Sequence, residues 1–123
     1  MPKILIVEDE KVLMDAYTIL FDSQGYDLHT ATNGLDAVAL CNTHQFDLIL
    51  LDLMMPVLDG VGFMRKMRPA ETMPATKIII MSNLSSGDAL AEALRFGAHD
   101  HIVKSSLGPR ELIDAIESYL QAQ

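Results

Sequence analysis

The chain has few of the features that mark secreted, membrane-spanning or nucleic-acid-binding proteins. Its single cysteine, Cys41, cannot form an internal disulfide bond, which is compatible with a reducing compartment. Its N-terminal apolar run, residues 4–7, is too short for a signal peptide or a membrane span. Only nine basic residues stand against seventeen acidic ones, and the net charge of −8 repels phosphate backbones. We therefore expect a cytoplasmic protein that binds cations but neither nucleic acid nor membrane.

The chain is long enough for one domain with a core of its own. It has 123 residues, and half of them are hydrophobic, which argues against disorder. A domain of this size buries roughly two-thirds of the surface of its unfolded chain. No low-complexity tract divides the sequence. We expect a single domain over residues 1–123, a stand-alone unit with no output module after its last amphipathic segment.

Short apolar runs alternate with amphipathic segments along the chain. The runs cover residues 4–7, 48–51 and 78–81, with weaker candidates at residues 26–31 and 99–103. Runs this short and this continuously apolar are typical of strands that are buried on both faces of a parallel sheet. The segments between them have their apolar residues at helical spacing. This alternation predicts an α/β fold with right-handed crossovers and helices on both faces of the sheet.

Five helices are expected, one after each strand. Their apolar positions are Val12, Leu13, Ala16, Ile19 and Leu20; Val38 and Leu40; Phe63, Met64 and Met67; Leu90, Ala93 and Leu94; and Leu112, Ile113, Ile116 and Leu120. Asn33 is a candidate N-cap for the second helix, Ser85 or Ser86 for the fourth, and Pro109 suits the first turn of the fifth. Gly25 and Gly97 are placed to end the first and the fourth helix.

Polar side chains follow the expected strands, where a doubly wound sheet binds its ligands. They are Glu8 and Asp9, Asp52, Ser82 and Asn83, and Lys104 and Ser105. Three clustered carboxylates repel one another, and a bound Mg²⁺ would remove that conflict. An aspartate beside such a cation is a competent nucleophile toward phosphorus, and a lysine and a hydroxyl can contact the phosphoryl oxygens. The sequence therefore predicts that Asp52 receives a phosphoryl group.

Four segments carry a resemblance to a known family. ILIVEDE, DLILLDLMMPVLDG, IIIMS and GAHDHIVKS together resemble the receiver domain of two-component response regulators, and the similarity spans the whole chain. The resemblance implies a flavodoxin-like fold with sheet order 2-1-3-4-5. It also implies a switch that accepts a phosphoryl group from a histidine kinase or a phosphotransfer protein. Such a switch signals by protein–protein contact. It catalyses only its own phosphorylation and slow dephosphorylation and is not expected to be an enzyme.

The resemblance also implies a role for each site residue. Asp52 matches the phosphoacceptor, Lys104 the residue that contacts the phosphoryl group, and Ser82 the switch hydroxyl. His101 stands where the family commonly has a rotating tyrosine or phenylalanine. The implied Mg²⁺ ligands are Glu8, Asp9, Asp52 and the backbone carbonyl of Met54. The downstream target is expected on the surface formed by the fourth helix, the strand at residues 99–103 and the last helix.

Two features leave alternatives open at this point. The family commonly has a cis Lys-Pro bond where this chain has Lys104-Ser105, and we predict that this bond is cis although it costs about 3–4 kcal/mol. His99 and His101, two apart on a strand, are also a weak candidate pair for a transition metal. Rival functions are a receiver that only docks to partners, a phosphohydrolase with an aspartyl nucleophile, and a flavin-binding protein of the same topology.

Overall fold

A five-stranded parallel sheet forms the centre of the protein, in a computed structural model that describes residues 1–83 and 87–121. The strands are β1 (Lys3–Val7), β2 (Asp27–Ala31), β3 (Leu48–Asp52), β4 (Lys77–Ser82) and β5 (Asp100–Val103). All neighbours pair in parallel, in the order β2-β1-β3-β4-β5. The predicted fold class and the sheet order are therefore confirmed.

Six helices lie in the described part of the chain, one more than the sequence predicted. They are α1 (Lys11–Asp22), α2 (Gly34–Thr43), α3 (Gly60–Met67), α4 (Pro69–Thr72), α5 (Gly87–Arg95) and α6 (Pro109–Gln121). The unpredicted one is α4, a four-residue helix that starts at Pro69 after Arg68 turns the chain in the left-handed conformation. A helix this short shows no apolar period, so the pattern could not reveal it.

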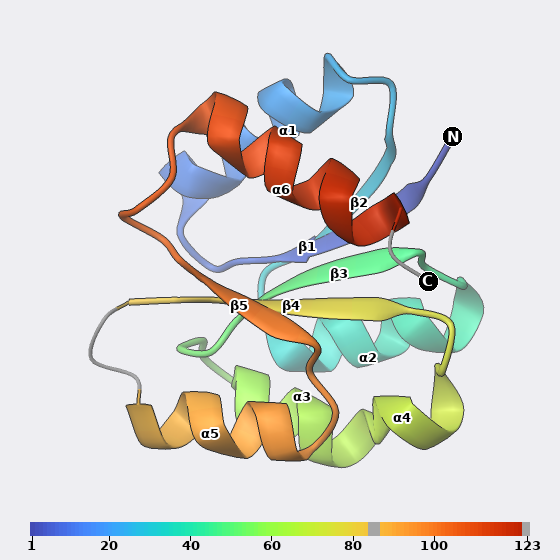
Figure 1. Ribbon diagram of the computed structural model, residues 1–123. Helices are drawn as coiled ribbons and strands as arrows, with labels where there is room; N and C mark the ends of the chain where they lie inside the picture. The colour runs from blue at the N-terminus through green and yellow to red at the C-terminus, as the bar shows by residue number, and fades with distance from the viewer. Residues whose placement is uncertain (84–86, 122–123) are drawn as a thin grey trace.

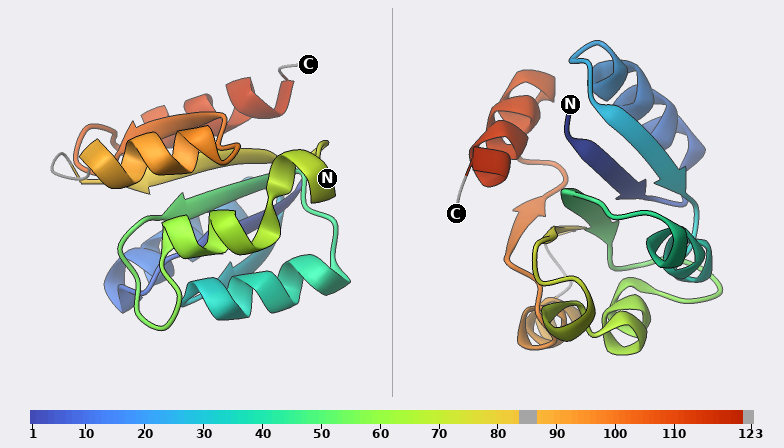
Figure 2. Two further views of the ribbon diagram at one scale, coloured as in Figure 1. Left: turned by 90° about the horizontal axis from the view of Figure 1, so that it is seen from below. Right: turned by 90° about the vertical axis from the view of Figure 1, so that its right-hand side faces the viewer.

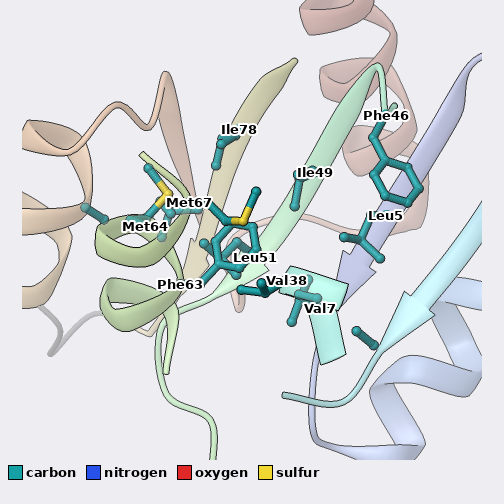
Figure 3. Packing of buried hydrophobic residues seen from close by; sticks show 14 of the residues in the cluster. Leu5, Val7, Val38, Phe46, Ile49, Leu51, Phe63, Met64, Met67 and Ile78 are labelled. Atoms are coloured by element: carbon teal, nitrogen blue, oxygen red, sulfur yellow. The ribbon is translucent and has the colours of Figure 1, made fainter. Parts of the chain in front are cut away.

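Helices cover both faces of the sheet, as the alternating pattern requires. Helices α1 and α6 lie on one face, and α2, α3, α4 and α5 lie on the other (Figures 1 and 2). Each face has its own buried apolar cluster. On the α3 side, Phe63 and Met64 pack toward the sheet residues Ile49, Leu51 and Ile78 (Figure 3). The described helices include none that is both long and apolar enough to cross a bilayer.

Local signals fix where several helices begin and end. The Asn33 side chain accepts a hydrogen bond from the backbone N–H of Asp36 at 2.8 Å, which confirms it as an N-cap. Helix α6 begins at Pro109, as predicted. Gly97 has a φ of +118° and ends α5, which also confirms the expectation. The proposed caps Ser85 and Ser86 lie outside the described residues.

The backbone approaches itself closely where α3 begins behind the end of β3. A Cβ atom at Gly60 would lie 2.5 Å from the backbone carbonyl oxygen of Asp52 and 2.8 Å from the Cα atom of Leu53. The Gly60 N–H donates to the Leu53 carbonyl at 3.0 Å. Because these contacts are with backbone atoms, a side chain here can be accommodated only if the segment that carries Asp52 moves.

We predict that Gly60→Ala lowers the free energy of unfolding by about 1–3 kcal/mol through this overlap. The measurement is the urea midpoint of the purified variant. Gly87→Ala is the matched control, since no described atom lies within 4 Å of a Cβ built there. Equal midpoints for the two variants would contradict the close approach at Gly60.

Candidate functional site

The carboxyl edge of the sheet gathers the acidic residues predicted from the sequence. Glu8 and Asp9 follow β1, and Asp52 is the last residue of its neighbour β3. The Leu48–Leu51 part of β3 is fully buried, which places the Asp52 carboxylate at the point where the apolar core ends. Asp52, at the end of β3, is therefore only 5% exposed, and a carboxylate buried to this extent needs partners.

Lys104 is the partner of two of these carboxylates. Its Nζ atom lies 2.8 Å from Glu8 Oε1 and 2.9 Å from Asp52 Oδ2. The side chains are 14%, 2% and 6% exposed for Lys104, Glu8 and Asp52, so the cluster is shielded from water. Burial by itself lowers the pKa of Lys104, but hydrogen bonds to Glu8 and Asp52 and their negative charges outweigh it and raise the pKa. The ammonium group therefore stays charged.

Backbone N–H groups orient the two buried carboxylates. Glu8 Oε2 accepts from the N–H of Glu10 at 3.0 Å, and Asp52 Oδ1 accepts from the N–H of Met54 at 3.3 Å. Each acid thus accepts from the residue two positions further on, where the chain leaves its strand. The Met54 side chain is largely exposed and takes no part in this arrangement.

The three acids fit a hard divalent cation. Glu8, Asp9 and Asp52 each offer one carboxylate oxygen, and these oxygens all lie within 4.8 Å of one another. Asp9 is exposed to solvent, whereas Glu8 and Asp52 are buried, so one side of the cluster remains open. Oxygen donors in this number, with an open side for water, are the set that Mg²⁺ prefers.

Ser82 and His101 are placed differently by the sheet. Ser82 is the last residue of β4, is buried, and its carbonyl accepts from the N–H of Lys104 at 2.8 Å. This bond ties the segment carrying Lys104 to the strand beside Asp52. His101 lies on the edge strand β5 opposite Ile80, and its side chain is 41% exposed. The structure therefore brings together Glu8, Asp9, Asp52 and Lys104, with Ser82 beside them and His101 on the edge strand.

The region around β5 departs from one expectation and bears on a second. The prediction of a cis Lys104–Ser105 bond is wrong, because every peptide bond of the described residues is trans. The trans form is the lower in energy before a non-proline residue, and Lys104 reaches both carboxylates with it. His99 precedes β5, and its Nδ1 accepts from the N–H of Ile78 at 3.0 Å, so this nitrogen is already engaged.

Tyr17 is a neighbour of the site that the sequence did not reveal. It lies on α1 and is half-buried. Burial raises its pKa, and the negative charge of Glu8 adds to the effect. In the sequence this tyrosine is indistinguishable from an apolar position of an amphipathic helix. Only the packing of α1 against the sheet brings it to the carboxyl edge.

A second polar contact joins β5 to the last helix. The hydroxyl of Tyr119 in α6 donates to Asp100 Oδ2 at 2.8 Å, and the N–H of His101 donates to Asp100 Oδ1 at 2.8 Å. The tyrosine hydrogen bond, followed by the backbone one, lowers the pKa of Asp100. Burial, with the hydrogen bond to Asp100, raises the pKa of Tyr119 to about 12. Asp100 thus links the expected switch position His101 to α6.

The fold and the site define a class of protein: a doubly wound α/β domain that carries an acidic cluster and a lysine at the carboxyl edge of its sheet. The model of the response regulator receiver domain family matches residues 4–117 of the chain. The chain therefore belongs to the response regulator receiver domain family. It has the fold of a signalling switch of two-component systems.

Curated proteins with similar sequences are longer than this chain. Response regulator ArlR of Staphylococcus aureus is 36% identical over 123 residues, which cover 100% of this chain and 54% of that protein. A probable transcriptional regulator, ycf27, of Cyanidium caldarium is 38% identical over 122 residues, which cover 96% of this chain and 46% of that protein. The chain thus spans about half the length of these two relatives.

Solved structures give the same family. A CheY-like response regulator receiver domain protein from Methanospirillum hungatei has a TM-score of 0.87 at 25% identity, covering 98% of this chain and 94% of that one. The receiver domain of a sensor histidine kinase from Pseudomonas aeruginosa has a TM-score of 0.86 at 26% identity and covers 98% of both chains. The latter carries a magnesium ion coordinated in its active site cleft.

The Tyr119–Asp100 hydrogen bond predicts a pH-dependent contribution to stability. A lowered carboxyl pKa stabilises the fold above the unfolded value near 3.8 and is lost as the pH falls through the folded value. A raised tyrosine pKa stabilises the fold below 10 and is lost as the pH rises through about 12. We expect Tyr119→Phe to cost about 1 kcal/mol at pH 7, because Asp100 is half exposed and solvent weakens the bond.

This cost should shrink toward pH 3, and urea unfolding at both pH values measures it. Tyr26→Phe is the matched control: burial raises the Tyr26 pKa too, but no described residue accepts a hydrogen bond from its hydroxyl. The cost of Tyr26→Phe should not change between pH 7 and pH 3. A Tyr119→Phe cost that is as large at pH 3 as at pH 7 would rule out the contribution of the Asp100 carboxylate.

Proposed function

We propose that this protein is a phosphorylation-activated switch in which Asp52 accepts a phosphoryl group from the phosphohistidine of a kinase or phosphotransfer protein. The observation that carries the proposal is the Lys104 ammonium group, held 2.9 Å from a nearly buried Asp52 carboxylate at the ligand-binding edge of the sheet. Membership of the receiver family supports it, as does the acidic cluster beside Asp52.

Each residue at this edge of the sheet has a separate role in the proposed phosphoryl transfer. Glu8, Asp9, Asp52 and the Met54 carbonyl would hold Mg²⁺, which when bound supplies positive charge to the phosphoryl oxygens. An Asp52 carboxylate oxygen forms the new bond to phosphorus as the bond to the donor imidazole nitrogen breaks, and the imidazole takes up a proton. Lys104 neutralises charge on a phosphoryl oxygen, and the Ser82 hydroxyl contacts another.

The output of the switch is a change in protein–protein contact. The new phosphoryl group adds negative charge at the edge and shifts a two-state equilibrium that includes Ser82 and His101. The surface formed by α5, β5 and α6 would bind the downstream target, since His101 lies on β5 between the two helices. We expect the protein to act in the cytoplasm as a domain over residues 1–123, with self-catalysed phosphoryl acceptance rather than substrate turnover.

Intact mass after incubation with acetyl phosphate tests the proposal. We expect one added phosphoryl group per chain when Mg²⁺ is present and none when EDTA replaces it. Asp52→Asn should abolish the adduct, because the amide has no carboxylate oxygen to attack phosphorus. Asp15→Asn is the matched control, since that aspartate is exposed on α1 and pairs with Lys11, and it should keep the adduct.

Two other outcomes of this experiment would overturn the proposal. An adduct that survives Asp52→Asn would place the acceptor elsewhere. No adduct on the folded wild-type protein, together with no binding of beryllofluoride, would leave a domain that docks to partners without phosphorylation.

A further inference from the structure

Several of the few basic residues of this acidic chain lie in one stretch of the sequence, outside the acidic edge. Five of the nine basic residues lie between the start of α3 and the end of α5: Arg65, Lys66, Arg68, Lys77 and Arg95. Three of them, the arginines, line a groove of about 370 Å³ together with Glu71 and Phe96. A groove of this size is within the range of small-molecule binding sites.

This groove lies at the opposite end of the molecule from Asp52. Helices α3 and α5 run antiparallel to the strands, so their last turns lie near the amino ends of the strands (Figures 1 and 2). Arg95 is the last residue of α5, five positions before β5 starts at Asp100. Asp52, Glu8 and Lys104 lie at the carboxyl ends of their strands or beyond them. A ligand in the groove would not compete with phosphorylation of Asp52.

One wall of the groove presents a flat stacked surface. The Arg65 guanidinium group lies over the Phe96 ring, 5.5 Å from its centroid, and pairs with Glu92 from α5. Its side chain is still 60% exposed, so the residue is open to a ligand in the groove. A planar guanidinium stacks readily on another aromatic system, and an aromatic ring can extend the stack.

Arg68 is held in the groove by an unusual backbone conformation. Its φ and ψ are 49° and 60°, a left-handed conformation that costs a residue with a side chain of order 1 kcal/mol. Its guanidinium nitrogen lies 2.9 Å from Glu71 Oε1 and 2.7 Å from Glu71 Oε2, so it contacts both oxygens of the carboxylate. Both contacts come from the same nitrogen, and a guanidinium group that binds a carboxylate can also donate to the oxygens of a phosphate.

Arg95 supplies a cation without a counterpart. Its side chain is exposed and makes no ion pair or hydrogen bond within the described part of the chain. The three arginines that line the groove thus have two carboxylate partners among the described residues, Glu71 in the groove and Glu92 beside it, while the whole chain carries a charge of −8. The helix dipole favours a cation at a helix C-terminus, which explains why a basic residue ends α5. It does not explain why three arginines line one groove.

We propose that this groove binds a phosphate-bearing ligand with a planar ring, of the nucleotide class. The phosphate groups would contact Arg68 and Arg95, because a guanidinium fork matches phosphate oxygens in two-point contact. The ring would stack on the outer face of the Arg65 guanidinium. Without the ligand, Arg68 forms an ion pair with Glu71, and the phosphate group displaces the Glu71 carboxylate. The chain would then carry a small-molecule site separate from its phosphorylation site.

Calorimetric titration of the full chain with ATP in Mg²⁺-free buffer containing EDTA tests this site. We expect saturable one-to-one binding, and an affinity about tenfold weaker for Arg95→Gln because one charged contact to phosphate is lost. Arg110→Gln is the matched control: it makes the same change of charge at an exposed position of α6 and should bind as the wild type does. Glu71→Gln should bind more tightly, because it frees Arg68.

Further titrations test separately the phosphate contacts, the stacking of the ring and the location of the site. Inorganic pyrophosphate should bind more weakly than ATP, and adenosine should not bind detectably, because the phosphates carry the charge and the ring adds the stacking. Asp52→Asn should bind ATP as tightly as the wild type does, which distinguishes this site from the one at the carboxyl edge. The proposal is overturned by an absence of saturable ATP binding at millimolar concentration, by equal weakening in Arg95→Gln and Arg110→Gln, or by binding lost in Asp52→Asn.

Discussion

The ammonium group of Lys104 between the carboxylates of Glu8 and Asp52 is the interaction on which the site depends. These two acids are at most 6% exposed, and the cation within 3 Å of each offsets the cost of burying a carboxylate. In the proposed function the same cation also contacts the phosphoryl oxygens. One interaction would thus serve both the stability of the site and its proposed chemistry.

The fold supplies this interaction through its topology. Glu8 and Asp52 end neighbouring strands, whereas Lys104 follows the edge strand and reaches Asp52 past the end of β4. The backbone bond from the N–H of Lys104 to the carbonyl of Ser82 fixes that crossing. Buried apolar residues on both faces hold the five strands in register, and the close contact at Gly60 sets the path of the chain after Asp52. The site residues therefore lie at or just beyond the ends of strands that the buried core holds in place.

The sequence predicted the features that follow from hydrophobic periodicity and from the order of the elements along the chain. It located the five strands, their sheet order through the family resemblance, and the edge where Asp9, Asp52 and Lys104 meet, because every parallel strand ends on the same side. It missed α4, which is too short to show a period, and the left-handed Arg68 before it. It also missed the arginine groove, because arginines from α3 and α5 meet only when those helices pack together. The prediction of a cis bond after Lys104 was wrong. The cis bond common in the family precedes a proline, and this chain has Ser105 at that position.

A double-mutant cycle on the free energy of unfolding tests the central interaction most directly. Urea unfolding at pH 7 would compare wild type, Lys104→Met, Asp52→Asn and the double variant. Lys104→Met leaves two buried carboxylates without a cation in the wild-type background but only one in the Asp52→Asn background. The account predicts that Lys104→Met costs at least about 1 kcal/mol less in the Asp52→Asn background, as expected for coupled buried charges. Equal costs in the two backgrounds would show that Lys104 and Asp52 do not stabilise each other and would contradict the account.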